Sequence, residues 1–414
     1  MERVTCMPIV LSDLIPATMS CAREVAKIHP GDHVLILADT TTDTDVVAAY
    51  RIAYESCGGN VSVITVPCAA VGCNPSVITD KLLTGVFPKL ALEAIKACDL
   101  YIDLTCYTDQ HGLYCAGCSA YGLQRGDLWE KYHTRSLNIT ISFKEGLAGE
   151  WGHYPDKLAK FITYKACQQV VEAANGDMEH ALIRVTDPEG TDITVEGFNL
   201  YRIAPDPKDI PEYPHLMTFG SGVVGLLPHH PTPNMEGVIV ASSIHPGHVP
   251  TAKATVKGGR VVKLEGGGEI ERLWTQDWEK NKDAVCTGRG SMFGDVPGPG
   301  VNWIEELMYG THPKAFRIGL KYRYEGSHSF VAWNGGTRRS GTLHFGIGGG
   351  VNETYRHRDL EVYFPTFTIN GVEMIKHGRL TALDLPEVRA EAEKYGDPDI
   401  LLAEAWIPDL PPVD

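Results

Sequence analysis

The sequence predicts an α/β domain with a parallel sheet over residues 1–180, followed by a β-rich (α+β) domain over residues 181–414. Three observations support this. Apolar runs alternate with helical periodicities in the first part, and strand-like runs separated by Gly, Pro and Asn dominate the second part. A length of 414 residues also exceeds one average domain. We therefore expect a boundary near residue 180.

The first domain is expected to alternate strands and helices. Residues 33–39 (HVLILAD) form a continuous apolar run after a Pro-Gly-Asp turn, which is typical of a buried strand. Residues 46–57 repeat apolar positions at helical spacing, with Asp43 or Asp45 as the cap and a Gly-Gly pair at the end. The alternation continues with strands at 60–66, 100–106 and 137–143 and helices at 90–99 and 158–175.

The second domain is expected to be built mainly from antiparallel strands. Turn residues separate strand-like runs at 181–187, 191–198, 237–244, 254–267, 315–324, 341–349, 360–369 and 372–380. Helical patterns occur only at 270–281 and around 303–310. A GxGxxG match at 220–225 is followed by three prolines within seven residues, which excludes the helix that a dinucleotide site requires.

Composition and charge exclude several classes of function. The formal net charge is −15, whereas binding to nucleic acid depends on clustered Lys and Arg. No apolar run approaches the roughly 18–20 residues of a membrane helix, and the first residues lack the pattern of a signal peptide. Eleven cysteines without framework spacing are typical of reduced, buried thiols. We therefore expect a cytoplasmic protein that binds neither nucleic acid nor membrane.

Histidines and carboxylates gather in the second domain. Ten of the sixteen histidines lie at or after residue 215. His357 and Asp359 are two apart in a predicted strand, so their side chains share one face, and His344 lies 13 residues earlier across a glycine-rich turn. Glu306 adds a carboxylate on or near a predicted short helix. These ligand types suit iron(II), zinc or manganese rather than calcium.

Each of these residues also has an ordinary structural explanation. A single histidine in a β-rich domain is often a surface or hydrogen-bonded core residue, and an H-x-D pair is common by chance. Glu306, next to another glutamate, would also suit the solvated face of a helix. The residues alone therefore leave the metal site and the structural alternative both open.

The order of the motifs resembles the aminopeptidase T family of metallopeptidases and its relatives, the 2,5-dihydroxypyridine 5,6-dioxygenases. PGDHVLILAD is similar to the N-terminal opening of that family, and EGVIVASSI with KATVKGGRVVKLEGG is similar to its middle strands. ELMYGTHP resembles its E-L-x-x-G-x-N-P motif, HFGIG its H-x-x-x-G motif and RHRDLEV its H-x-D motif. The resemblance covers most of the chain, and it implies the two-part fold already expected.

The resemblance implies a metal site formed by Glu306, His344, His357 and Asp359. The first metal-binding glutamate of the peptidases would fall near Gly225, where this chain has none. The dioxygenases also lack it and hold one iron, but their third ligand is a histidine where this chain has Glu306. Their catalytic histidine corresponds to Thr194 here. The resemblance therefore favours one metal ion over two.

Three functions follow as alternatives. The first is a mononuclear iron(II) dioxygenase that opens a hydroxylated N-heteroaromatic ring, with Glu306 as a further ligand or as the base for the ring hydroxyl. The second is an aminopeptidase T-like hydrolase of an amide or ring C–N bond, in which zinc or manganese activates water and Glu306 is the general base. The third is a binding protein with a closed structural metal site.

A small-molecule substrate is expected in the two enzymatic cases. Glu306 and Tyr355 are the predicted catalytic residues, with Tyr355 placed to stack on an aromatic ring. Arg338 and Arg358 suit a carboxylate or enolate oxygen of the substrate. For His229 and His230 three interpretations remain open: they line the pocket entrance, replace the missing glutamate, or are ordinary loop residues. The related peptidases are commonly dimers, so a homodimer or higher homo-oligomer is expected.

Overall fold

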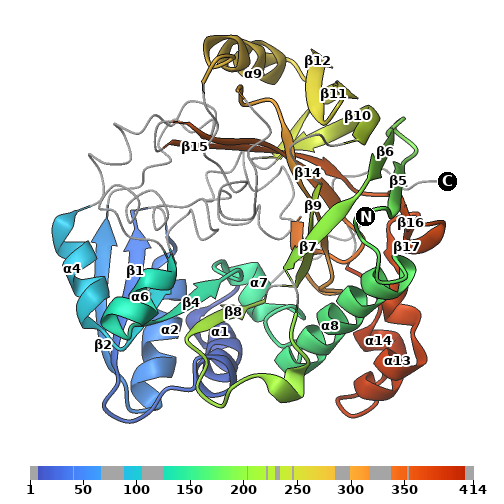
Figure 1. The fold of residues 1–414 in the computed structure, drawn as a ribbon. Helices are drawn as coiled ribbons and strands as arrows, with labels where there is room; N and C mark the ends of the chain where they lie inside the picture. Colours follow the sequence, from blue (N-terminus) through green and yellow to red (C-terminus); the bar gives the residue numbers. More distant parts are fainter. Residues whose placement is uncertain are drawn as a thin grey trace, which may run out of the picture.

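The fold combines two β-sheets and the helices packed on them (Figure 1). The computed structural model describes residues 8–40, 42–66, 88–104, 125–202, 204–220, 222–228, 234–244, 247–284, 299–316, 337–351 and 354–405. Within these residues the first sheet is parallel and the second is antiparallel along its whole length. The predicted fold class is therefore confirmed.

The parallel sheet is five-stranded, in the order β2-β1-β3-β4-β8. Its strands are β1 (His33–Asp39), β2 (Asn60–Val66), β3 (Leu100–Asp103), β4 (Arg135–Ile139) and β8 (Leu216–Phe219). In β1 every residue after His33 is buried, as expected for a strand covered on both faces. Alternate residues face different cores, because Val34 and Ile36 join one cluster while Leu35 and Leu37 join another.

Helices cover both faces of this sheet. They are α1 (Leu11–Ser20), which continues into a π-helix (Cys21–Val25), α2 (Thr44–Ser56), α4 (Lys89–Ala97), α6 (Arg125–Tyr132) and α7 (Lys144–Ala148). α1 and α2 pack on one face, and α4 and α6 pack on the other. Of the two predicted caps for α2, the structure uses Asp43, whose side chain accepts a hydrogen bond of 2.8 Å from the Asp45 amide.

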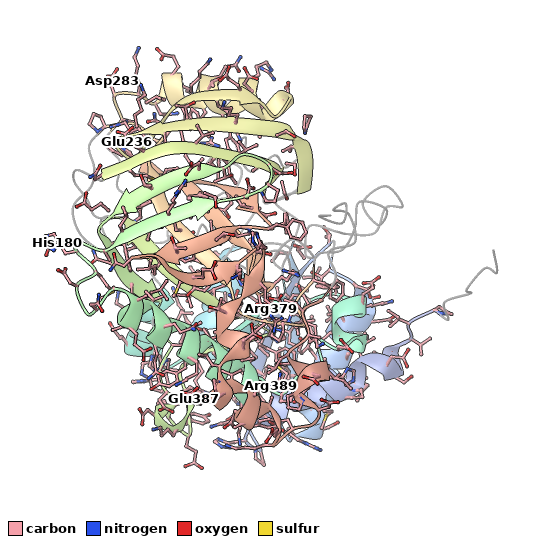
Figure 2. The ribbon with its side chains drawn as sticks, turned by 90° about the vertical axis from the view of Figure 1, so that its right-hand side faces the viewer. His180, Glu236, Asp283, Arg379, Glu387 and Arg389 are labelled. Atoms are coloured by element: carbon pink, nitrogen blue, oxygen red, sulfur yellow. The ribbon has the colours of Figure 1, made fainter. Side chains whose placement is uncertain are left out.

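The second sheet contains 13 strands among the described residues. Its main path runs β18-β17-β16-β5-β6-β10-β15-β14-β13-β9-β7, and β11 and β12 extend it from β10. The strands are β5 (Leu182–Thr186), β6 (Asp192–Glu196), β7 (Phe198–Arg202), β9 (Val223–Pro228), β10 (Asn234–Ile244), β11 (Gly247–Lys257), β12 (Arg260–Gly266), β13 (Ile304–Gly310), β14 (Leu343–Val351), β15 (Thr354–Val362), β16 (Thr366–Ile369), β17 (Val372–Lys376) and β18 (Arg379–Leu380). Figure 2 shows Glu236 toward the β12 end and Arg379 toward the other end.

The remaining helices pack on this sheet or beside it. They are α8 (Asp156–Ala173), α9 (Glu269–Lys280), α13 (Pro386–Ala392) and α14 (Pro398–Leu401), with short 3₁₀ turns at Pro207–Asp209 and Thr381–Asp384. One hydrophobic cluster joins α8, α9 and α13 to the strands. None of the helices in the described part combines the length and apolar character needed to cross a membrane.

The chain crosses between the two sheets on both sides of the predicted boundary at residue 180. α8 precedes residue 180 but packs into the core of the antiparallel sheet, because Leu158, Ile162 and Val170 lie in that cluster. β8 follows residue 180 but completes the parallel sheet beside β4. The division into residues 1–180 and 181–414 remains a prediction, and these two elements show how closely the halves are interwoven.

The helix expected around residues 303–310 is wrong, because these residues form β13. All seven residues of β13 are buried, and the strand pairs with β9 on one side and β14 on the other. The strand lacks the strict alternation of a half-exposed strand, because it is buried on both faces and its register shifts between Ile304 and Glu306. The adjacent Glu305 and Glu306 therefore resemble the solvated face of a short helix in the sequence. The GxGxxG segment at 220–225 runs into strand β9, which extends to Pro228, so the described residues after the motif form a strand rather than a helix.

Candidate metal centre

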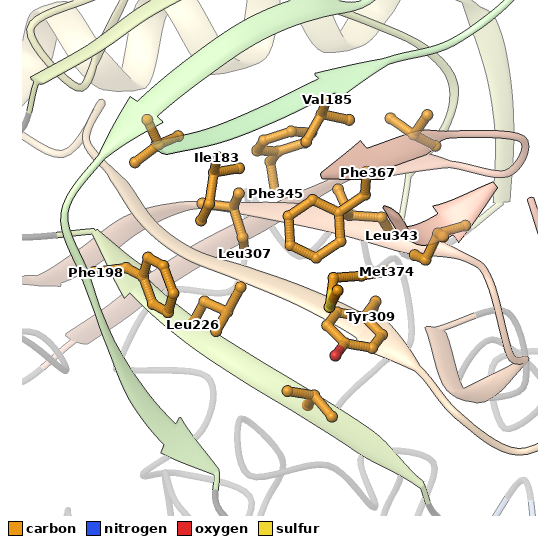
Figure 3. Packing of buried hydrophobic residues seen from close by; sticks show 14 of the residues in the cluster. Ile183, Val185, Phe198, Leu226, Leu307, Tyr309, Leu343, Phe345, Phe367 and Met374 are labelled. Carbon is orange, nitrogen blue, oxygen red and sulfur yellow. The ribbon is translucent and has the colours of Figure 1, made fainter. Parts of the chain in front are cut away.

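Three adjacent strands, β13, β14 and β15, build the candidate centre. One face of these strands packs into the core. Five residues on it belong to the main hydrophobic cluster: Leu307, Tyr309, Leu343, Phe345 and Leu360. Figure 3 shows the first four packed with Phe367 and Met374. Side chains alternate between the two faces of a strand. The neighbouring residues of these strands therefore face the opposite side, and there the sequence places charged and imidazole groups.

Glu306, His344 and Asp359 meet on this opposite face. One ligand atom from each lies within 4.8 Å of the others. The exposed fraction is 1% for Glu306, 3% for His344 and 1% for Asp359. The Nε2 atom of His344 lies 3.6 Å from Oε1 of Glu306. The structure thus brings together three of the four predicted metal ligands, on three different strands.

A glycine makes this meeting geometrically feasible. Gly346 on β14 pairs with Glu306 on β13 and with Asp359 on β15, so the two carboxylates flank it in one row across the sheet. Strands two apart in a sheet are separated by roughly 9.5–10 Å, and side chains can reach toward each other across that distance only if nothing stands between them. Because glycine has no side chain, the space above Gly346 is left for the carboxylates.

The donor set fits a divalent cation. Two ligand atoms bound to one ion at about 2.1 Å lie roughly 3.0–3.5 Å apart in adjacent positions, close to the 3.6 Å between Glu306 and His344. Two buried carboxylates facing one space repel each other, and a cation between them removes that cost. Nδ1 of His344 is buried and makes no hydrogen bond to any residue that the structure describes. One imidazole with two carboxylates suits iron(II), manganese or zinc.

The other predicted site residues are placed less completely. His357 and Tyr355 both lie in β15, and His357 pairs with Gly348. Their side chains lie outside the described part, so their predicted roles remain predictions. His229 and His230 lie outside the described residues altogether.

The two predicted substrate arginines are buried. Arg358 donates from Nη2 to Oδ2 of Asp277 on α9 at 2.5 Å, and its guanidinium lies 5.7 Å from the Trp274 ring. It alternates with Asp359 along β15, so this contact is on the other face of the strand. Arg338 is 4% exposed and donates to the Thr337 hydroxyl at 2.8 Å. Contact of either arginine with a substrate remains a prediction.

The chain is firmly anchored where it leaves β13. His312 lies between aromatic rings, 6.0 Å from the Trp151 centroid and 4.7 Å from the Tyr154 centroid. Burial, assisted by the positive charge of Lys314, lowers the pKa of His312 to about 3, so the ring is neutral near pH 7. The Lys314 ammonium donates to the Ile400 carbonyl at 2.7 Å. These contacts fix the end of the strand that carries the glutamate ligand.

Sequence reasoning missed a third carboxylate on the same face, that of Glu361. Glu361 is 1% exposed and lies directly opposite His344 on β14 and Ser243 on β10. The period of two that links His357 to Asp359 extends to Glu361 within RHRDLEV, so the signal was present in the sequence. Its importance depends on which strands are neighbours, and the sequence does not show that.

Comparison with known proteins identifies the fold. No family model and no curated protein sequence matches this chain. The solved structure of 2,5-dihydroxypyridine dioxygenase from Pseudomonas putida KT2440 is similar, with a TM-score of 0.54 and 18% identity over 90% of this chain and 98% of that one. AmpT from Thermus thermophilus, an aminopeptidase T, is similar with a TM-score of 0.50 and 13% identity over 89% and 99%. The resemblance inferred from the motifs is therefore confirmed at the level of the fold, across nearly the full length of both structures.

Proposed function

We propose that this chain is a metal-dependent enzyme in which Glu306, His344 and Asp359 hold one divalent cation, most readily iron(II), with His357 as a further ligand. The observation that carries the proposal is the buried triad of one imidazole and two carboxylates on three strands of one sheet. Strands backed by a packed core hold ligands more precisely than loops do. The two similar structures, a dioxygenase and an aminopeptidase, support an enzyme built on this fold.

The finer proposal is cleavage of a hydroxylated N-heteroaromatic ring with dioxygen. With His357, the site provides two imidazoles and Asp359, the ligand set typical of non-haem iron(II) oxygenases, and such an ion supplies the binding and activation of dioxygen. Glu306 is then either a further ligand or the base whose carboxylate accepts the proton of the ring hydroxyl, which leaves the substrate oxygen anionic. Tyr355 is proposed to stack against the ring.

The alternative is hydrolysis of an amide or ring C–N bond. The observation that favours it is Glu306 itself, a buried carboxylate whose Oε1 lies only 3.6 Å from the His344 imidazole. A carboxylate in this position is well suited to take a proton from an attacking water, while zinc or manganese supplies Lewis-acid activation. The similarity to AmpT is compatible with this chemistry.

One experiment separates these proposals. The protein is purified anaerobically, its metal content is measured by mass spectrometry, and dioxygen uptake is followed with iron(II) and 2,5-dihydroxypyridine. In parallel, release of 4-nitroaniline from amino-acid 4-nitroanilides is measured after loading with zinc or manganese. Iron-dependent oxygen uptake supports the dioxygenase. Hydrolysis without oxygen uptake supports the alternative.

Ligand variants test the site itself. We expect H344A and D359A to lose stoichiometric metal while remaining folded by circular dichroism. H180A is the matched control, because His180 is an exposed histidine that also contacts a carboxylate, that of Asp177 at 3.0 Å. Full metal content in both ligand variants, equal to that of H180A, would refute the proposed centre.

A further inference from the structure

Glu361 occupies a special position beside the candidate centre. It follows Asp359 by two residues on β15, so both carboxylates lie on the same face of the strand. In the sheet it is directly opposite His344, and facing residues of antiparallel strands have their Cβ atoms about 4.5–5.5 Å apart. The exposed fraction of Glu361 is only 1%. A fully buried carboxylate is costly, so its position requires an explanation.

The structure holds the Glu361 carboxylate in a defined orientation. Ser243 donates from Oγ to Oε2 at 2.6 Å, and Tyr363 donates from Oη to the same oxygen at 2.8 Å. Ser243 is completely buried, and Tyr363 is 5% exposed. Both donors reach one oxygen, so they orient the carboxylate from one side. Glu361 does not belong to the triad of ligand atoms, which consists of Glu306, His344 and Asp359.

The imidazole of His344 needs an acceptor on its other nitrogen. Nε2 faces Glu306 in the triad, whereas Nδ1 is buried and has no hydrogen-bond partner among the described residues. A histidine that binds a metal through one nitrogen carries a proton on the other, and that N–H is nearly always held by a carboxylate, a carbonyl or a water. Glu361 is the residue that faces His344 across the strand pair on the β15 side.

We propose that Glu361 is a positioning residue, which accepts the Nδ1–H of His344 directly or through one ordered water when the centre is loaded. This inference rests on the metal site proposed above. Ser243 and Tyr363 keep the carboxylate in place, and the carboxylate fixes the tautomer in which Nε2 offers its lone pair. It also makes the imidazole a stronger donor, because the negative charge stabilises positive charge on the ring. Glu361 contacts neither the ion nor the substrate in this arrangement.

Metal affinity and ligand-field spectra test the role of Glu361 without any assay of activity. Zinc affinity of the apo-protein is measured by competition with a chromophoric chelator, and cobalt(II) is added as a spectroscopic probe. We expect E361Q to bind zinc roughly 10- to 100-fold more weakly, the range typical of lost partners of metal-bound histidines, and to shift the visible cobalt(II) bands. The double variant S243A/Y363F keeps the carboxylate but removes its two anchors, so a smaller loss is expected.

Two controls keep the outcomes distinct. E265Q removes an exposed glutamate that pairs with Lys263 on β12, and it should leave both readouts unchanged. Thermal unfolding of each apo-protein shows whether it is folded; if E361Q is not, S243A/Y363F decides the question. The role of Glu361 is overturned if a folded E361Q keeps the wild-type zinc affinity and cobalt(II) spectrum. If E361Q is unfolded, the same result in S243A/Y363F overturns it. Metal retained by H344A and D359A instead overturns the centre itself.

Discussion

The pair between Asp277 and Arg358 offers a quantitative test of how the site strands are supported. The Arg358 side chain is 3% exposed and that of Asp277 is 11% exposed, with 2.5 Å between Nη2 and Oδ2. Removing one partner of a buried ion pair leaves the other charge in a medium of low polarity, which costs about 3–5 kcal/mol. D277A should therefore lower the free energy of unfolding by about that amount. R358M should cost somewhat less, because the Asp277 carboxylate is closer to solvent.

The double variant D277L/R358M tests whether Asp277 and Arg358 stabilise the fold as a pair. Replacing a buried pair by apolar side chains of similar size is often nearly neutral. We therefore expect the double variant to be closer to the wild type than either single variant, with a coupling energy of several kcal/mol. The assay is urea unfolding followed by the fluorescence of the seven tryptophans, which include Trp274 of α9. D192A is the control, because Asp192 and its partner Arg184 are both exposed, with side chains 58% accessible, and a loss below about 1 kcal/mol is expected.

Two results would refute this reasoning. The first is a loss below about 1 kcal/mol in each single variant, since that is the range of exposed pairs. The second is strict additivity in the double variant, which would show that the two side chains act independently. If R358M stays as stable as the wild type but loses substrate affinity, Arg358 acts on the substrate, as the sequence had suggested, rather than on α9.

Three further predictions concern the elements around the site. Burial lowers the pKa of His312 from 6.5 to about 3, so between these pH values the unfolded chain binds more protons than the folded one. The free energy of unfolding therefore falls as the pH falls through that window, by up to about 1.4 kcal/mol per pH unit. In urea titrations the free energy of unfolding should depend less steeply on pH in H312N than in the wild type. A Cβ added at Gly310 would lie 2.1 Å from the Arg339 carbonyl oxygen, so G310A should lower the free energy of unfolding by about 1–3 kcal/mol in the same assay. An unchanged urea midpoint would contradict the close packing at the end of β13. D43A removes the cap that holds the Asp45 amide and should cost about 1 kcal/mol, whereas D43N should restore most of it; equal losses in both would argue against capping.

Much of the fold could be predicted because local patterns and tertiary environment agree. The run HVLILAD is apolar throughout, and β1 is indeed buried between two layers of helices. The helix after it has a cap, a periodic face and a terminating Gly-Gly pair, and α2 occupies almost the predicted residues. Such signals depend on neighbours within a few positions, so the sequence contains them completely.

The error at residues 303–310 has a different cause. A short segment that mixes apolar residues with Glu305 and Glu306 fits a helix as well as a buried strand, and only the pairing with β9 and β14 distinguishes them. The position of β8 in the parallel sheet was equally hidden, because four residues of strand carry no mark of the sheet they join. In both cases long-range pairing decided the structure.

The sequence by itself determined the types of ligand and their likeness to a known family of metalloenzymes. The H-x-D spacing, the preceding His344 and Glu306 already named the three residues that now form the triad. Only the tertiary structure decided which of these residues lie close together and which residues are their neighbours. It placed Gly346 between the two carboxylates, and Glu361 opposite His344, through the register of three adjacent strands. Register is a property of the pairing between distant segments, so a residue pattern can supply the chemistry of a site while only the folded sheet can assemble it.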